Sequence, residues 1–148
     1  MNELEKGALN GVKVLDFSTL LPGPLASLFL AETGAEVIKI ERPVTGDEMR
    51  LSHPKWNDES VSFSMLNRGK KSLCLDLKDQ SSKDILKPLI ETTDIIIEQF
   101  RPGVMKRLGL DYENIKKINS KIIYVSITGY GQTGPKKNGC RTRLELYW

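Results

Sequence analysis

The chain has few of the side chains that metal sites and disulfide frameworks require. Its 148 residues include two cysteines, Cys74 and Cys140, and one histidine, His53. Neither cysteine belongs to a CxxC pair, so we expect free thiols in a reducing compartment. A lone histidine in a polar segment is more often solvated than catalytic, and no Cys/His/Asp cluster has a zinc-ligand spacing. The sequence therefore favours neither a zinc site nor a histidine-based triad.

Long hydrophobic runs are also missing. No run approaches the ~20 apolar residues of a membrane span, and the polar N-terminus does not resemble a signal peptide. The composition of 39% hydrophobic and 28% charged residues is typical of a soluble globular protein. The net charge of +3 is spread along the chain, which does not favour nucleic acid but suits an anionic small ligand. We expect a cytoplasmic protein with neither nucleic-acid nor membrane partners.

The first third of the chain is organised as one βαβ unit, from Gly11 to Arg42. A strand is predicted at 12–17, a turn at Ser18–Pro24, and a second strand at 36–40. The helix between them should end at Gly34, and its predicted inward stripe is Leu25, Leu28, Phe29 and Ala31. Strands so connected lie parallel, and ligands bind beyond their carboxyl ends. That rule indicates the segments 18–24 and 41–43.

The rest of the chain continues the alternation of strands and helices. The segment 43–61 reads as a long surface loop. Further helices are predicted at 62–67, 83–91, 104–108 and 112–118, and further strands at 72–76, 94–98 and 121–127. Ser81 or Ser82 should cap the second of these helices and Pro88 should kink or shorten it. The last two strands are apolar on both faces. The pattern predicts an α/β fold with an open, mainly parallel sheet.

Similar chemistry recurs around the predicted strands. Basic groups, an aromatic ring and bare glycine backbone are what a phosphorylated nucleotide needs. The residues concerned are Glu41, Arg42, Arg68, Lys70, Lys71, Lys78, Phe100, Arg101, Arg107, Gly129, Tyr130 and Gly131. We interpret the set as a ligand site, although each residue alone could be an ordinary solvated charge. There is neither a GxGxxG nor a GxxxxGK[ST] motif.

Acidic residues also lie at the predicted strand edges: Asp16, Asp76, Asp94 and Glu98. Two of them could form a carboxylate pair for acid–base chemistry. Capping of strand ends or simple solvation is the interpretation we favour.

Five stretches resemble the N-terminal part of the family III CoA-transferases, which include formyl-CoA transferase, carnitine CoA-transferase and the related α-methylacyl-CoA racemases. They are LNGVKVLDFS, LLPGPLASLFLAETGAEVIKIERP, LNRGKKSLCLDLK, DIIIEQFRPGVMKRLGLDYE and IIYVSITGYGQTGP, in family order between Leu9 and Pro135. The resemblance implies a Rossmann-like domain that binds coenzyme A or acyl-CoA as substrate, with no covalently bound cofactor. It also implies a homodimer of two interlocked ring-shaped chains, which a shortened chain would not be expected to form.

The resemblance also implies a set of CoA contacts. By position these are Leu21, Pro22, Arg42, Leu75, Lys78, Gln99, Phe100, Arg107, Tyr130 and Gly131. Leu75 and Lys78 would line the adenine pocket, and Tyr130 and Gly131 would lie near the thioester. Gln99 departs in type from the asparagine common in the family, but it keeps the amide.

The resemblance implies no catalytic residue in this chain. Family members are two to three times longer, and their nucleophilic aspartate, which forms an acyl anhydride, lies beyond the GYGQTGP segment. We therefore expect a truncated, inactive relative of an enzyme that moves CoA between carboxylic acids. Two alternatives stay open: a fragment of an α-methylacyl-CoA racemase, whose aspartate and histidine exchange a proton, and a CoA-binding module without chemistry of its own.

The tail does not fit the family. We assign residues 1–135 to the CoA-binding domain and 136–148 to a non-homologous tail. Many relatives read Ala-Gly-His-Asp-Leu-Asn-Tyr at this point, and one back-translation of 140–148, read one base later, gives that sequence. We interpret the tail as the product of a reading-frame shift near Gly139, and the chain as a pseudogene fragment. The alternative is that the chain is a genuine short protein. Marginal stability is expected, because the tail would leave exposed Leu144, Leu146, Tyr147 and Trp148.

Overall fold

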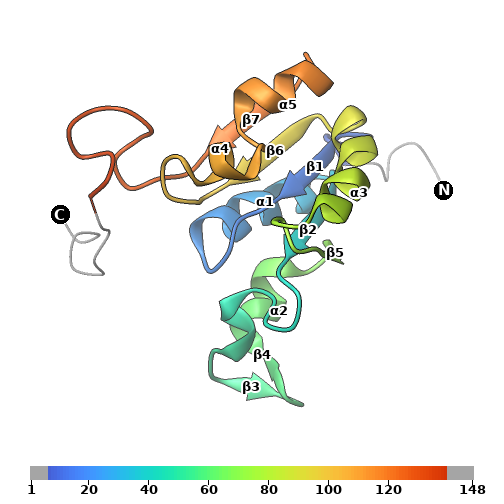
Figure 1. Ribbon diagram of the computed structural model, residues 1–148. Coiled ribbons are helices and arrows are strands. Elements are labelled where there is room, and N and C mark those ends of the chain that lie inside the picture. The colour runs from blue at the N-terminus through green and yellow to red at the C-terminus, as the bar shows by residue number, and fades with distance from the viewer. Residues whose placement is uncertain (1–6, 140–148) are drawn as a thin grey trace.

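The computed structural model describes residues 7–139, which form a five-stranded parallel sheet beside a small hairpin. Across the sheet the strands are β5 (Lys71–Cys74), β2 (Glu36–Glu41), β1 (Lys13–Asp16), β6 (Ile95–Glu98) and β7 (Ile123–Ser126) (Figure 1). The chain runs outward in one direction from β1 to β5 and then returns to β6 and β7 on the other side. The strand order thus reverses between the neighbouring strands β1 and β6, which is the topological switch point of an open α/β sheet. The predicted fold class is confirmed.

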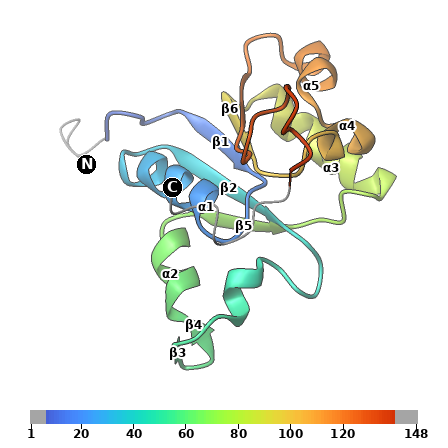
Figure 2. The ribbon, with the colours of Figure 1, turned by 90° about the vertical axis from the view of Figure 1, so that its left-hand side faces the viewer.

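Helices lie on both faces of the sheet (Figure 2). One face is covered by α1 (Pro22–Glu32), the other by α3 (Gln80–Glu91), α4 (Val104–Leu108) and α5 (Tyr112–Ile118). The larger apolar cluster lies on the α3–α5 side and includes Leu15, Leu86, Ile90, Ile96, Met105 and Ile115. The smaller cluster lies on the α1 side, with the buried members Val14, Ala35, Val37 and Ile97. Strands β1 and β6 are thus buried on both faces, as their apolar sequences predict.

The predicted βαβ unit is present, with one correction to its turn. Helix α1 begins at Pro22, inside the segment 18–24 that the sequence assigns to a turn. Prolines at 22 and 24 are compatible with a helix here, because the N–H groups of the first helical turn have no partner within the helix. Gly34, with φ +104°, follows the helix end and confirms the predicted terminating glycine.

The segment 43–61 is not the irregular loop that the sequence suggests. It contains η2 (Glu48–Leu51), a hairpin of β3 (Lys55–Trp56) and β4 (Glu59–Ser60), and the first residue of α2 (Val61–Asn67). Asn57 and Asp58 have positive φ angles of 46° and 66°, as the central residues of a type I′ turn do. The prediction is wrong because strands of two residues leave no alternating pattern in the sequence.

Helix α3 is longer than the predicted range 83–91. It begins directly after Asp79, whose extended backbone makes it the N-cap residue in place of Ser81 or Ser82. Asp79 makes no capping hydrogen bond with its side chain, so its backbone conformation alone marks the start of the helix. Pro88 lies within the helix and does not shorten it. Within residues 7–139, no helix is long and apolar enough to cross a membrane.

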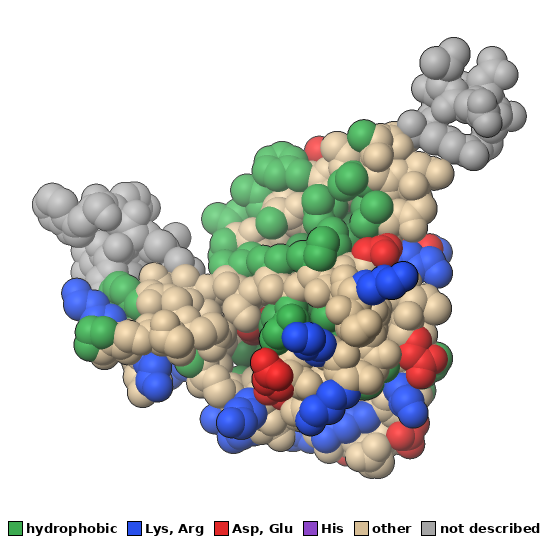
Figure 3. Space-filling model, turned by 90° about the horizontal axis from the view of Figure 1, so that it is seen from above, with side chains coloured by type: hydrophobic (Ala, Val, Ile, Leu, Met, Phe, Trp, Pro, Cys, Tyr) green, Lys and Arg blue, Asp and Glu red, His purple; other side chains and the backbone are tan. Residues whose placement is uncertain are grey.

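The α1 side of the sheet keeps apolar side chains exposed. Phe29 of α1 and Ile123 of β7 are each 57% exposed. The predicted inward stripe of α1 is thus wrong in part, because Leu28 is buried but Leu25 and Phe29 are not. Figure 3 shows the molecule from above the view of Figure 1, which is the side where β7 lies. Hydrophobic side chains gather in one area of this surface. Strand β7, whose sequence is apolar on both faces, thus has one face without a covering layer among the described residues, where Ile123 and Val125 are exposed. The tail residues Leu144, Leu146, Tyr147 and Trp148 lie outside the described residues.

Candidate functional site

A cavity of about 250 Å³ opens at the carboxyl ends of four neighbouring strands. The segments that follow β1, β2, β5 and β6 all contribute to its wall, and we call it the switch-point pocket. Its apolar lining is Phe17, Ile40, Leu75, Leu77 and Phe100, and its polar lining is Thr19, Glu41, Arg42, Gly46 and Glu48. Open α/β sheets bind ligands at this position. The two segments that the strand-end rule indicates, 18–24 and 41–43, both flank the pocket.

Arg42 provides the positive charge of the pocket. Its guanidinium lies 2.9 Å from the carboxylate of Glu48, and both side chains are about 60% exposed. An exposed ion pair of this kind contributes only about 0–1 kcal/mol. The guanidinium can therefore exchange Glu48 for an anionic ligand at small cost.

The carboxylate of Glu41 holds the loop after β2 through hydrogen bonds from that loop and from its neighbours. Arg50 donates hydrogen bonds of 2.8 Å to both carboxylate oxygens, and Ser72 donates one of 2.6 Å. The guanidinium of Arg50 also lies 3.7 Å from the centre of the Phe63 ring. Burial acts to raise the pKa of Glu41, but the hydrogen bonds from Arg50, Ser72 and the Asp47 backbone N–H outweigh it and lower the pKa to about 2. Glu41 is therefore a structural carboxylate rather than a free acid or base.

Two lysines and two aspartates are buried beneath the pocket. The ammonium of Lys39 lies 2.8 Å from the carboxylate of Asp47 and donates a 2.7 Å hydrogen bond to the Ser18 carbonyl. The ammonium of Lys70 lies 3.5 Å from the carboxylate of Asp16. Burial lowers the pKa of Lys70 to about 8, although Asp16 opposes the shift. We call the loop after β1 the first loop. Lys39 joins its first part, at Ser18, to strand β2, and Asp16 joins the same residue to strand β1.

The basic turn 67–71 does not line the switch-point pocket, which corrects its place in the predicted ligand site. Lys70 is buried against Asp16, as described above. Arg68 and Lys71 are exposed and form ion pairs with carboxylates of the α1–β2 segment, Glu32 and Glu36. Their charges are neutralised within the fold.

Gln99 holds the first loop from the β6 side. Its side-chain oxygen accepts a 3.2 Å hydrogen bond from the Gly23 N–H, and its side-chain nitrogen donates a 2.6 Å hydrogen bond to the Thr19 carbonyl. A Cβ atom at Gly23 would lie only 2.8 Å from the same Gln99 oxygen and closer still to Ser18. The amide that the resemblance assigns to CoA is thus engaged with the loop that lines the pocket.

Three of the acidic residues at strand edges act as caps. Asp16, Asp76 and Glu98 each accept a hydrogen bond from the backbone N–H two residues further along the chain. Asp94 instead accepts a 2.9 Å hydrogen bond from the Lys13 N–H. The capping interpretation is confirmed for these carboxylates, and no two of them form the alternative catalytic pair.

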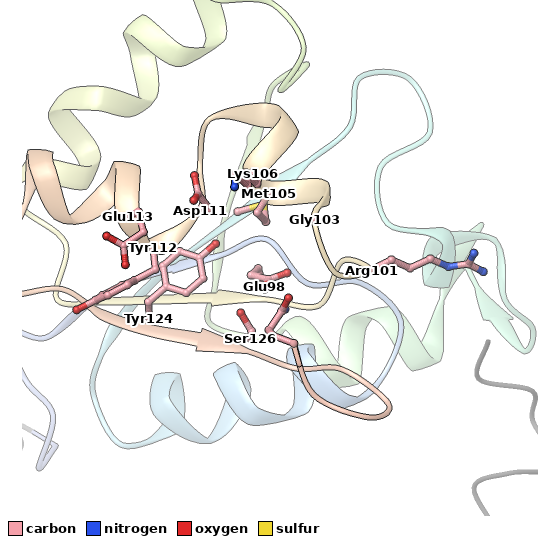
Figure 4. A pocket seen from close by; sticks show the side chains of 11 residues that line it. Glu98, Arg101, Gly103, Met105, Lys106, Asp111, Tyr112, Glu113, Tyr124 and Ser126 are labelled. Carbon is pink, nitrogen blue, oxygen red and sulfur yellow. The ribbon is translucent and has the colours of Figure 1, made fainter. Parts of the chain in front are cut away.

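A second cavity, of about 260 Å³, lies where β6 and β7 end beneath α4 and α5 (Figure 4). Glu98 and Ser126 point towards each other there, whereas Arg101 points away. Burial raises the pKa of Glu98, against hydrogen bonds from Ser126 and the Phe100 N–H. Burial also raises the pKa of Tyr124, whose hydroxyl donates to the Leu110 carbonyl. The buried polar groups Glu98 and Tyr124 thus have partners within the fold, and the cavity contains none of the predicted CoA contacts.

The structure brings together only part of the predicted CoA site. Arg42, Leu75 and Phe100 line the switch-point pocket. The others lie outside its lining: Leu21, Pro22, Lys78, Arg107, Tyr130 and Gly131, all exposed, and Gln99, which bonds the first loop. Their contacts with CoA stay predictions. Sequence reasoning missed Phe17, Ile40 and Leu77. The one feature that could have indicated them is that each is an apolar residue at or beyond the carboxyl end of a strand.

The fold is thus a doubly wound α/β fold with a pocket at its switch point. A family model described as CoA-transferase family III matches residues 9–140, and the chain belongs to this family. The chain is similar to acetyl-CoA:oxalate CoA-transferase from Acetobacter aceti, with 45% identity over 130 residues, which covers 88% of this chain and 33% of the relative. Succinyl-CoA:glutarate CoA-transferase from Mus musculus is 48% identical over 128 residues, or 86% of this chain and 29% of the relative.

Solved structures agree with the family assignment. A crystal structure of a CAIB/BAIF family protein from Brucella suis superposes with a TM-score of 0.89 and 34% identity, over 96% of this chain and 39% of that protein. The chain thus spans about a third of the length of the relatives it matches. The resemblance read from the sequence is confirmed.

Proposed function

We propose that the switch-point pocket binds the nucleotide half of coenzyme A, and that the chain is the CoA-binding part of an enzyme that moves CoA between carboxylic acids. The observation that carries this proposal is the lining of the pocket at the switch point: apolar walls with an exchangeable arginine at the edge. Membership of CoA-transferase family III supports a CoA thioester as the ligand. A volume of about 250 Å³ suits an adenine nucleotide rather than the whole of CoA.

Each wall of the pocket has a role in this proposal. The adenine ring packs between Leu75 and Phe100, because aromatic and aliphatic side chains both accept the face of a purine. Arg42 leaves Glu48 and forms charge-assisted hydrogen bonds with a phosphate of the ligand. The pantetheine arm then leaves the pocket towards the segment after β7, where the resemblance places Tyr130 and Gly131.

The acyl-transfer step needs a carboxylate that this pocket does not offer. Transfer through an acyl anhydride requires a free carboxylate to attack the thioester carbonyl and displace the CoA thiolate. Glu41 stays engaged with Arg50. Glu48 is released when Arg42 turns to the phosphate, but it then lies at the nucleotide end of the ligand, whereas we place the thioester near the segment after β7. We therefore propose that the 148-residue chain binds CoA without transferring it, and that the nucleophile of the complete reaction belongs to residues outside this chain.

Calorimetric titration of the chain with CoA tests the site. We expect Phe100→Ala to weaken binding by about 1–3 kcal/mol, the usual worth of stacking a base on an aromatic ring. Arg42→Ala should cost roughly 1.5–3 kcal/mol, the worth of a charge-assisted hydrogen bond. Arg68→Ala is the matched control, because Arg68 is also an exposed, ion-paired arginine but lies outside the pocket. Unchanged affinity in both pocket variants would show that the nucleotide does not bind in this pocket.

Activity is tested with the same preparation. CoA transfer from acetyl-CoA to oxalate or glutarate, and trapping of an acyl-enzyme by hydroxylamine, should both stay at the level of a blank. Turnover above the blank would show that the chain supplies its own nucleophile. Binding without turnover would agree with the proposal for this chain. Absence of binding would overturn it.

A further inference from the structure

One buried carboxylate joins the two loops that form the switch-point pocket. Asp47, in the loop after β2, is 0% exposed. One of its carboxylate oxygens accepts hydrogen bonds from two backbone N–H groups, that of Leu20 at 3.0 Å and that of Met49 at 2.9 Å. Its other oxygen lies 2.8 Å from the ammonium of Lys39. The same ammonium holds the carbonyl of Ser18, two residues before Leu20.

The backbone of the first loop depends on such a contact. Leu20 has a φ angle of +63°, in the left-handed region that residues with a Cβ atom seldom adopt. A conformation of this kind persists where surrounding contacts impose it. The Asp47 carboxylate is the contact that binds the Leu20 N–H, and Thr19 immediately before it lines the pocket. This bond holds the wall from the β2 side, and the Gln99 bond to the Thr19 carbonyl holds it from the β6 side.

Asp47 is itself held in register with strand β2. Its own backbone N–H donates a 3.0 Å hydrogen bond to the carboxylate of Glu41, the last residue of that strand. Gly46, directly before it, has a φ angle of +61°, and a Cβ atom there would lie 2.8 Å from the same carboxylate. The loop after β2 thus folds tightly onto Glu41. Asp47 transmits this fixed position to the loop after β1.

We propose that Asp47 is a positioning residue for the CoA nucleotide: its carboxylate clamps the loop after β1 to the loop after β2 and so sets the distance between two walls of the pocket. Asp47 is fully buried and is not part of the lining, so it acts without touching the ligand. The proposal rests on the proposed function of the pocket. It adds that the affinity for CoA depends on a carboxylate oxygen that CoA never contacts.

Two double variants separate the clamp from the buried charge pair. Asp47→Asn with Lys39→Met removes both buried charges but keeps a side-chain oxygen for the Leu20 and Met49 N–H groups. Asp47→Ala with Lys39→Met removes the same charges and that oxygen as well. Both variants lose the ion pair and the Lys39 bond to Ser18, so they differ only in the side chain at position 47: asparagine can keep the bonds to the Leu20 and Met49 N–H groups, and alanine keeps neither. The Leu20 amide then reports on the clamp separately from the cap of η2 that the Met49 bond provides. The comparison avoids leaving a lysine buried without a partner, which would destabilise the whole fold.

Affinity for CoA and amide hydrogen exchange are the two readouts. We expect the alanine variant to bind CoA about tenfold more weakly than the asparagine variant, the effect of losing hydrogen bonds that hold a wall. In the ligand-free proteins, the Leu20 amide should exchange about tenfold faster in the alanine variant, because its acceptor is gone. Equal affinities in the two folded variants would overturn the proposal. Should the alanine variant not fold, an unprotected Leu20 amide in the ligand-free wild-type chain would overturn it, and a protected one would support it.

The same experiment separates the two proposals. If the wild-type chain does not bind CoA, the proposed function fails, whatever the Leu20 amide does. If it binds CoA and the two variants bind alike, the function stands and the role of Asp47 fails. Exchange at Leu20 needs no ligand, so it tests the clamp in either case.

Discussion

The loops after β1 and β2 differ from the segment after β7, although all three lie at the same edge of the sheet. The first two are tied down by buried groups: Asp47, Lys39 and Glu41 each bond backbone atoms of these loops. In the segment after β7, by contrast, every residue from 129 to 139 is exposed. The resemblance predicts CoA contacts in both anchored loops, at Leu21, Pro22 and Arg42, and it predicts that Tyr130 and Gly131 of the exposed segment lie near the thioester.

This difference separates binding from chemistry. A pocket whose walls are fixed before the ligand arrives does not have to order them on binding, which favours affinity. The segment 129–139 has exposed contacts instead, such as that of Lys136 with the Tyr130 ring, so it is fixed less firmly than the two loops. Under the proposed function, the chain therefore holds a prepared site for the nucleotide and an unprepared one for the thioester.

The largest expected effect comes from removing a buried anchor. Asp16→Ala deletes the one carboxylate beside the buried ammonium of Lys70, which keeps only the Pro24 carbonyl and the Asn67 side chain, and it leaves the buried Ser18 and Ser27 hydroxyls without their acceptor. It should destabilise the chain by about 3–5 kcal/mol, the cost of breaking a buried charge pair. Urea unfolding at neutral pH measures it. The control is Glu36→Ala, which removes an exposed ion pair with Lys71 and should cost under about 1 kcal/mol. Similar losses in both variants would mean that the loops are not anchored by buried charge.

An intermediate effect is expected from acid titration of Glu41. Its pKa in the folded chain, about 2, is below the ordinary 4.5, so the folded state binds this proton less readily than the unfolded state. The resulting stability is present above pH 4.5 and is lost as the pH falls from 4.5 towards 2.

The variant Glu41→Gln isolates this contribution. It should be less stable than the wild-type chain by roughly 1.5–3 kcal/mol near pH 7, where the charged hydrogen bonds with Arg50 are lost. The difference between the two proteins should then shrink as the pH falls below 4.5. Thermal melts at a series of pH values measure it. A difference that stays constant down to pH 3 would show that Glu41 does not anchor the loop through its charge.

The smallest expected effect is at the exposed segment. Tyr130→Ala should change the affinity for CoA by less than about 0.5 kcal/mol, the range of surface substitutions, because the entropy cost of ordering this segment offsets its attraction to the ligand. Titration under the conditions used for Phe100→Ala gives the comparison. A loss as large as that of Phe100→Ala would erase the contrast between the two loop regions and support a thioester site as well prepared as the nucleotide site.

The order of elements was predictable because it depends on patterns that a sequence displays. Short apolar runs alternate with helical segments, and Gly34 marks a helix end, so the parallel sheet and its ligand-binding edge followed. The hairpin around Asn57 and Asp58 was not predicted, because its strands are too short to show a period. The exposure of Phe29 was not predicted either, since an apolar helical residue gives no indication of whether a neighbour covers it.

The anchors of the pocket were the least predictable part. Lys39, in the run EVIKIE, reads as an outward charge on a strand, and Asp47 reads as a loop residue. Their burial follows from a pairing between positions that the sequence does not mark as neighbours. A lysine flanked by isoleucines in a central strand was the one available signal, because a solvated position is uncommon there. Arg42 and Phe100 were found through the resemblance and the strand-end rule together, and Leu75 through the resemblance alone.

The two side chains that hold the first loop also differ in when they can act during folding. Asp47 reaches Leu20 across 27 positions, whereas Gln99 reaches Thr19 across 80. Closing the longer loop costs roughly 1 kcal/mol more chain entropy, and it requires β6 to exist. The Asp47 contact is therefore the cheaper of the two to close and needs only the βαβ unit, whereas the Gln99 contact also needs β6. One side of the switch-point pocket is thus complete within the first third of the chain, and the wall that carries Phe100 depends on a strand from the second half.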